Sequence, residues 1–195
     1  MPTALFSAYD KSSILELAKK LSQANWHLMA TEGTAHVLRA AGLTVKSLTA
    51  FTGSPEILDG RVKTLHPAIY AGILAKATPE HLSDLAQVNA NLIDLVVIGL
   101  MPFDKLVNHP DSSHGEIINH IDVGGTELVR AAGKNYERVA VVVDPEDQNL
   151  VIKDLEESGR ISGETRELLA IRAFKFVANY DQQVARYLEI HRAQS

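Results

Sequence analysis

The stretch Ile93-Asp94-Leu95-Val96-Val97-Ile98-Gly99-Leu100 decides the fold of this chain. It is a short apolar run rich in β-branched residues, and it ends just before Pro102, which is typical of a strand buried on both faces of a parallel sheet. Four further short apolar runs are predicted to be strands: Thr3–Ala8, Trp26–Ala30, Val45–Leu48 and Val139–Val143. Amphipathic segments alternate with these runs, and the alternation favours an α/β fold with a mainly parallel sheet.

The segments between and after the predicted strands have helical spacing of their apolar residues. In the first of them, Ile14, Leu17 and Leu21 recur at helical intervals, and Asp10 or Ser12 can cap the helix. The predicted helices are Ser13–Ala24, a helix from the Thr31–Thr34 turn to Ala41, Pro79–Asn89, Gly115–His120, Thr126–Asn135, Pro145–Ser158 and Gly163–Arg192. We therefore predict a single domain, with a core over residues 1–145 and a helical extension over residues 146–195.

Composition narrows the function classes. The chain has 195 residues, 46% of them hydrophobic, which is enough to bury a sizeable core. It has no cysteine, so disulfides, thiolate metal sites and cysteine nucleophiles are excluded, and a cytoplasmic location is expected. A net charge of −5 argues against a nucleic-acid partner. The sequence has neither a signal-peptide pattern nor an apolar run of membrane-spanning length, so no membrane partner is expected.

The ends of the predicted strands indicate where a ligand binds. In open parallel sheets, ligands lie outside the carboxyl ends of the strands. The turns at these ends are Tyr9–Ser12, Thr31–Thr34, Gly99–Phe103 and Asp144–Pro145, and the Asp59–Pro67 and Asp122–Gly125 loops can join the same rim. The Thr31–Thr34 turn opens a helix, where free backbone N–H groups and the helix dipole favour an anion.

The loop Asp59–Pro67 carries the strongest chemical signal at this rim. Its Gly and Pro residues exclude a helix interior, and its polarity excludes a core strand. Arg61 offers a planar fork of donors suited to a phosphate or carboxylate, and Lys63 offers a compact point charge. A solvated basic turn is the alternative, and it would be favoured if this loop stood alone. His66 could be catalytic, but a turn histidine bonded to the backbone is favoured.

Two motifs are highly specific: Arg61-Val62-Lys63-Thr64-Leu65-His66-Pro67, and Ile121-Asp122-Val123-Gly124-Gly125 followed by Arg130-Ala131-Ala132 and Lys134-Asn135. Shorter matches cover nearly the whole chain: Leu5-Phe6-Ser7, Asp10-Lys11, Gly33-Thr34-Ala35, Thr52-Gly53, Pro55-Glu56-Ile57, Gly72-Ile73-Leu74-Ala75 and Pro102-Phe103. In this order the motifs resemble the cyclohydrolase half of the bifunctional purine-biosynthesis enzyme that joins inosine monophosphate (IMP) cyclohydrolase to a transformylase. The transformylase half has no counterpart in residues 1–195. The resemblance implies a methylglyoxal-synthase-like, three-layer α/β/α sandwich.

The resemblance also implies a reaction. The family closes the purine ring of 5-formamidoimidazole-4-carboxamide ribonucleotide to give IMP and water, as a hydrolase of the cyclic-amidine class that uses no metal and no cofactor. Three catalytic roles follow from it. Lys134 is the proton donor and acceptor, Lys63 stabilises negative charge on the formyl oxygen, and Asp122 holds the carboxamide or helps to withdraw its proton. Read from the residue pattern alone, Lys134 is a surface lysine near a helix end, and Asp122 is a helix cap.

The remaining site residues implied by the resemblance bind the purine nucleotide. They are Tyr9, Asp10, Lys11, Thr31, Glu32, Gly33, Thr34, Arg61, Thr64, Met101, Val123 and Gly124. Two cations together with a helix amino terminus suit a nucleotide phosphate.

Four positions depart from the family pattern within this site. Gly99 and Met101 stand where the family has Asn and Tyr, and a thioether cannot donate a proton. Tyr9 stands where a small hydroxyl residue is expected, and Glu32 replaces a glycine. Three hypotheses stay open. The chain is an IMP cyclohydrolase, a diverged cyclohydrolase for a modified nucleotide, or a non-catalytic nucleotide-binding domain.

The predicted carboxyl-terminal helix has more apolar residues than a helix packed at a sheet edge needs. These residues are Leu168, Leu169, Ile171, Phe174, Phe176 and Val177. Two interpretations are weighed equally: the helix packs back on its own sheet, or it forms the seam of a homodimer.

Overall fold

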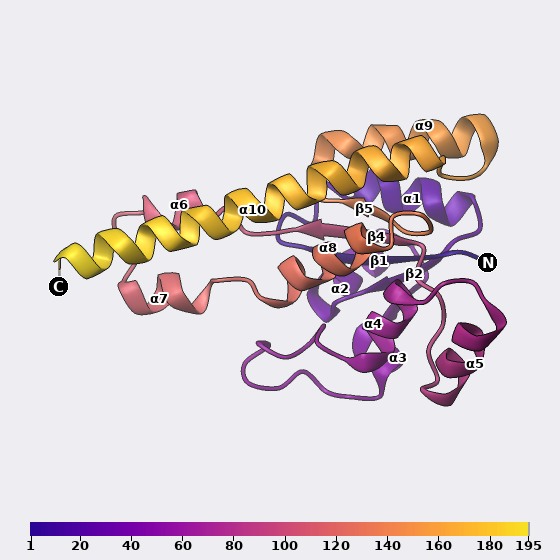
Figure 1. Ribbon diagram of the computed structural model, residues 1–195, viewed down its shortest axis with the longest axis horizontal. Helices are drawn as coiled ribbons and strands as arrows, with labels where there is room; N and C mark the ends of the chain where they lie inside the picture. Colours follow the sequence, from indigo (N-terminus) through magenta and orange to yellow (C-terminus); the bar gives the residue numbers. More distant parts are fainter. Residues whose placement is uncertain (195) are drawn as a thin grey trace.

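The computed structural model describes residues 1–194, and its centre is one parallel sheet. The strands are β1 (Thr3–Ala8), β2 (His27–Ala30), β3 (Val45–Ser47), β4 (Leu95–Gly99) and β5 (Ala140–Val142). Their order across the sheet is β3-β2-β1-β4-β5 (Figure 1). All five predicted strands are confirmed, and four of them are shorter than predicted by one to three residues at their ends.

The helices agree with the predicted ones, with three additions. The predicted helices are observed as α1 (Leu15–Gln23), α2 (Glu32–Ala40), α5 (Pro79–Gln87), α7 (His114–Asn119), α8 (Gly124–Lys134), the 3-10 turn η1 (Pro145–Asp147) with α9 (Gln148–Ser158), and α10 (Gly163–Gln194). The additions are α3 (Leu48–Thr52), α4 (Pro67–Leu74) and α6 (Phe103–Val107). Because α4 is apolar on nearly every side, it lacks the periodicity that identifies an amphipathic helix.

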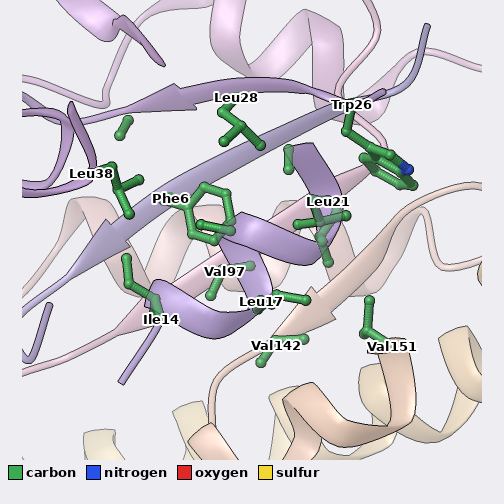
Figure 2. Close-up of a cluster of buried hydrophobic side chains, with 14 of the residues drawn as sticks. Phe6, Ile14, Leu17, Leu21, Trp26, Leu28, Leu38, Val97, Val142 and Val151 are labelled. Carbon is green, nitrogen blue, oxygen red and sulfur yellow. The ribbon is translucent and has the colours of Figure 1, made fainter. Parts of the chain in front are cut away.

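Helices cover both faces of the sheet, so the predicted α/β/α sandwich is confirmed. Alternate residues of each strand point to opposite faces. Phe6 of β1 and Val97 of β4 pack with α1, α2 and α9 on one face (Figure 2). Leu5 of β1 and Val96 of β4 pack with α4, α8 and α10 on the other face.

The long helix α10 belongs to this core and also extends beyond it (Figure 1). Leu169, Ala173 and Val177 are buried against the sheet and its helices, so the extension packs back on its own chain. Ile171 and Phe174 are 48% and 42% exposed. The division at residue 145 and the homodimer stay predictions.

The sheet order places a topological switch point between β1 and β4. From β1 the chain crosses to β2 on one side, and from β4 it crosses to β5 on the other. Ala8 and Gly99, the last residues of the two strands, are register partners. The crevice at such a point is where open α/β sheets bind ligands.

Candidate functional site

A candidate anion cradle, formed by Lys11 and the Thr31–Thr34 turn, lies at the amino terminus of α2. A Cβ placed on Gly33 would lie 3.6 Å from Cε of Lys11, so the lysine side chain passes directly over this turn. The hydroxyl of Thr31 donates to that of Thr34 at 3.2 Å and does not cap the helix. The first backbone N–H groups of α2 are therefore available to a ligand. The structure thus brings Lys11, Thr31, Gly33 and Thr34 together at one turn.

The two carboxylates next to this cradle are engaged elsewhere. The hydroxyl of Ser47 and then that of Thr49 hold the pKa of Glu32 below its ordinary value against the opposing effect of burial. Glu32 thus faces the end of β3, where Ser47 lies. Asp10 accepts bonds from the Ser12 hydroxyl at 2.6 Å and the Ser12 N–H at 3.0 Å, which lower its pKa. Asp10 therefore shapes the turn after β1.

A close contact joins the Asp59–Pro67 loop to the amino terminus of α8. A Cβ placed on Gly124 would lie only 2.3 Å from the hydroxyl oxygen of Thr64, which is 3% exposed. A Cβ on the next residue, Gly125, would lie 2.6 Å from Leu100, directly after β4. Only glycines permit such an approach. The contact brings both specific motifs, with Lys63 and Asp122, to the rim beside β4.

Asp122 is held on two sides. Its carboxylate oxygen Oδ1 accepts a hydrogen bond from the N–H of Gly125 at 2.5 Å, and its own N–H donates to the hydroxyl of Tyr180 at 2.8 Å. The carboxylate is therefore a helix cap, as its pattern indicates, and it also lies at the rim. The next residue, Val123, is 56% exposed and leaves an apolar side chain at the surface beside Asp122.

The basic loop lies on the long extended connection between α3 and α4 (Figure 1). Ile57 and Val62 form an antiparallel bridge, and Leu58, Asp59 and Gly60 between them all have positive φ. This turn presents Arg61, and one of its guanidinium N–H groups donates to Asn119 at 2.7 Å.

The residues that follow the basic loop open helix α4. Nδ1 of His66 accepts a hydrogen bond from the N–H of Ala68 at 3.2 Å, so the histidine caps α4. The interpretation of His66 as a turn residue bonded to the backbone agrees with this contact. Lys63 is exposed on the same segment, just before the buried Thr64.

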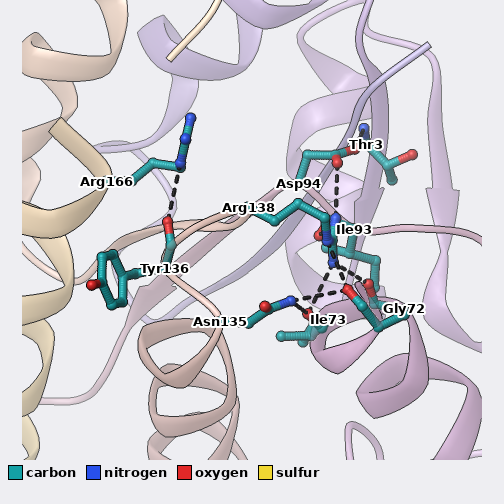
Figure 3. Close-up of polar contacts among 10 residues, drawn as sticks. Thr3, Gly72, Ile73, Ile93, Asp94, Asn135, Tyr136, Arg138 and Arg166 are labelled. Atoms are coloured by element: carbon teal, nitrogen blue, oxygen red, sulfur yellow. Dashed lines mark hydrogen bonds and ion pairs between the residues drawn. The ribbon is translucent and has the colours of Figure 1, made fainter. Parts of the chain in front are cut away.

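Lys134 lies away from these residues within the chain. It ends α8, whose axis rises about 15 Å between Gly124 and Lys134. Its neighbour Asn135 donates to the carbonyls of Ile73 and Ala75 at the end of α4. Arg138 pairs at 2.9 Å with Asp94, which precedes β4 (Figure 3). Lys134 therefore lies toward the amino ends of the strands, opposite the rim that carries Asp122.

Three of the four departures from the family pattern lie at the ends of β1 and β4. The N–H of Tyr9 donates to the carbonyl of Gly99 at 2.7 Å, while its side chain is 58% exposed. A Cβ on Gly99 would meet Ala8 at 3.5 Å, an ordinary contact, so packing does not require glycine there. Met101 is half-buried directly after Leu100.

Sequence reasoning missed Tyr70, which lies on α4 beneath this rim. Its hydroxyl oxygen is buried and has no hydrogen-bond partner among residues 1–194. Burial, and then the nearby charges of Glu127 and Asp122, raise the pKa of Tyr70 to about 12. The phenol is therefore neutral at physiological pH. The neighbouring residues of α4 are apolar on nearly every side, so the sequence has no periodic pattern there that would mark Tyr70 as a site residue.

We expect Tyr70→Phe to raise the free energy of unfolding by about 1 kcal/mol, because a buried donor without a partner costs free energy. Urea denaturation of the variant and the parent measures the change, with the exposed Tyr136→Phe as a control that should leave stability unchanged. A loss of stability in Tyr70→Phe would mean that the hydroxyl has a bonding partner in solution.

Three further observations concern other parts of the molecule. A groove of about 1150 Å³ lies near the amino ends of β1 and β2 and includes Trp26, Phe51 and Leu82, but no predicted site residue.

Within residues 1–194, no group of three or more His, Asp or Glu side chains is placed to hold a metal ion. No helix in the same part of the chain is long and apolar enough to cross a membrane.

The chain is similar to known proteins in both sequence and fold. The family model of the MGS-like domain matches residues 13–127, and that of the AICARFT/IMPCHase bienzyme matches residues 132–195. The bifunctional purine biosynthesis protein PurH of Desulfitobacterium hafniense (strain DSM 10664 / DCB-2) is 49% identical over 185 residues, which are 95% of this chain and 36% of that protein. PurH of Sorangium cellulosum (strain So ce56) is 45% identical over 185 residues, 95% of this chain and 35% of its own length.

The chain thus spans just over a third of the length of these relatives. The crystal structure of ForH matches with a TM-score of 0.82 at 37% identity, over 94% of this chain and 97% of that chain. These matches confirm the resemblance stated from the motifs and the methylglyoxal-synthase-like fold.

Proposed function

Because the chain belongs to the MGS-like domain family, and because it aligns with PurH over 95% of its own length, we propose that it is an enzyme with IMP cyclohydrolase activity. Its substrate in this proposal is a small purine-pathway nucleotide, 5-formamidoimidazole-4-carboxamide ribonucleotide. The observation that carries the proposal is the contact between Thr64 and Gly124, which brings the segments of Lys63 and Asp122 to one rim. The cradle of Lys11 and Gly33 lies at the carboxyl ends of the neighbouring strands and suits the phosphate.

The proposed reaction is an intramolecular ring closure. The carboxamide nitrogen attacks the formyl carbon and forms a C–N bond, and the formyl oxygen later leaves as water. One hydrogen of that water comes from the carboxamide nitrogen and the other from the formamido nitrogen. Holding both groups in one geometry supplies much of the rate. A positioned acid or base adds about 10²–10⁴-fold.

Two residues carry this chemistry in the proposal. Asp122 accepts the carboxamide proton, and the bond from Gly125 N–H to Oδ1 fixes the direction of its carboxylate. Lys63 places a positive charge near the formyl oxygen as negative charge develops on it. Lys11 and the first turn of α2 hold the phosphate, with Arg61 as an additional cation at the rim.

The direct test is conversion of the formamido-ribonucleotide to IMP by the purified protein, followed by ultraviolet absorbance. We expect turnover that is lost in Lys63→Ala, while IMP still binds in calorimetry with at most about a tenfold change in Kd. Absence of turnover in the parent protein would contradict the proposal. Binding of IMP without turnover of any substrate would favour the non-catalytic domain.

Lys134→Ala distinguishes two expectations. The family resemblance implies that Lys134 acts in catalysis, whereas the geometry of a single chain places it far from Asp122. Because Lys134 lies about 15 Å along α8 from the end that carries Asp122, we expect kcat to fall by less than about tenfold, which is below the effect of a general acid or base. The same assay measures it, and Lys153→Ala, which removes an exposed lysine of α9, is the control. A fall of 10²-fold or more would place Lys134 in a working site, by movement of the end of α8 or by contribution from a second copy of the chain.

A second candidate substrate is a nucleotide with a modified base. The observation that favours it is the combination of Met101 and Gly99 at the end of β4, which removes a phenol and an amide from the rim. This candidate predicts weak turnover of the ordinary formamido-ribonucleotide and a gain on Met101→Tyr. An unchanged rate in that variant would contradict a role of Met101 in specificity.

A further inference from the structure

The backbone of Asp122 is tied to the carboxyl-terminal helix. The N–H of Asp122 donates to the hydroxyl of Tyr180 at 2.8 Å, and this bond joins the loop before α8 to α10. Tyr180 is only 6% exposed. A part-buried backbone donor in a loop needs a partner, and here the phenol oxygen provides it.

The same tyrosine also packs on the segment after β4. The rings of Tyr180 and Phe103 meet edge to face, with their centroids 5.9 Å apart. Phe103 is buried two residues after Met101. Tyr180 therefore lies between two rim segments, one with Met101 and one with Asp122.

The position of Tyr180 is fixed from within the core. Leu169, Ala173 and Val177 are buried on α10 and precede it at helical spacing along one stripe. Tyr180 continues this stripe by one more turn, where the apolar ring packs and the hydroxyl reaches the loop. Burial, opposed in part by the bond from Asp122, raises the pKa of Tyr180, so the phenol stays neutral at physiological pH.

We propose that Tyr180 is a positioning residue of the site: its hydroxyl fixes the backbone of Asp122, so that α10 forms part of the catalytic apparatus. This inference rests on the proposed function for its effect on turnover. The N–H of Gly125 directs the carboxylate of Asp122, and the hydroxyl of Tyr180 holds its backbone. Both contacts are needed to hold the carboxylate as accurately as an intramolecular ring closure requires.

Tyr180→Phe tests the inference, because it keeps the ring on Phe103 and removes the acceptor. We expect kcat to fall about tenfold with KM within about twofold, because the misplaced carboxylate acts in the transition state more than in binding. Tyr187→Phe is the matched control. Tyr187 lies on the same helix and packs edge-on against the same Phe103 at 6.0 Å, but its hydroxyl contacts His114.

Amide hydrogen exchange provides a readout that does not depend on turnover. In Tyr180→Phe, the Asp122 amide should exchange about tenfold faster than in the parent, while the amides of α10 near Val177 keep their rates. In the parent protein, the Asp122 amide should exchange with solvent as slowly as the slow amides of α10. If the parent shows no cyclohydrolase turnover, the proposed function fails and the exchange experiment still decides the role of Tyr180.

Two results would overturn the inference. One is an Asp122 amide whose exchange is the same in Tyr180→Phe and in the parent, or is already fast in the parent. The other is an equal loss of kcat in Tyr180→Phe and Tyr187→Phe, which would mean that the packing of α10 matters and the bond to Asp122 does not.

Discussion

Asp122→Asn should lower kcat by roughly 10²–10⁴-fold, the contribution of one positioned acid or base. The amide keeps an oxygen that can accept the bond from Gly125 N–H, so the cap on α8 is retained. What the substitution removes is the negative charge and the capacity to take a proton from the carboxamide. Absorbance of the product measures kcat, and urea denaturation should give a free energy of unfolding within about 1 kcal/mol of the parent.

Asp104→Asn is the control for this prediction, because Asp104 is an exposed carboxylate on α6 that follows the same rim. It should leave both kcat and stability unchanged. Full activity in Asp122→Asn would show that Asp122 serves the structure alone, as a helix cap. A large loss of stability in Asp122→Asn would mean that its charge, and not its oxygen, holds the start of α8.

Gly124→Ala should destabilise the protein by about 1–3 kcal/mol and lower kcat by about 10²-fold. The added Cβ would lie 2.3 Å from the Thr64 hydroxyl oxygen, so the loop carrying Lys63 must separate from the start of α8. A displacement of about 1 Å at the reacting groups is enough for a loss of this size. Urea denaturation and the ring-closure assay measure the two effects.

Gly115→Ala is the matched control, because Gly115 also lies in the first turn of a short helix but has open space around its Cβ position. It should be neutral or slightly stabilising, since alanine restricts the unfolded chain. Adding Thr64→Ala to Gly124→Ala removes the clashing hydroxyl and should restore most of the stability. If the double variant is no more stable than Gly124→Ala, the close approach of the two segments is not what limits stability.

The fold could be predicted because its signals are local. Each of the five strands is a short apolar run, and each run stands where the structure has a strand. Two helices show the limit of such signals. Phe103–Val107 is a single short turn, and Pro67–Leu74 is buried on most sides, so neither has an amphipathic period.

The sequence by itself determined the layers, the parallel sheet and the loops that form the rim, because strand periodicity and Gly and Pro positions are encoded within a few residues. Only the tertiary structure decided which of the motif residues meet. Thr64 and Gly124 come into contact because α4 and α8 pack with their amino termini together. Lys134 lies at the other end of α8, about 15 Å along the helix from Gly124. The direction of Glu32 toward Ser47 and the bond from Asp122 to Tyr180 likewise join residues distant in sequence, and such pairs depend on three-dimensional packing that no local pattern records.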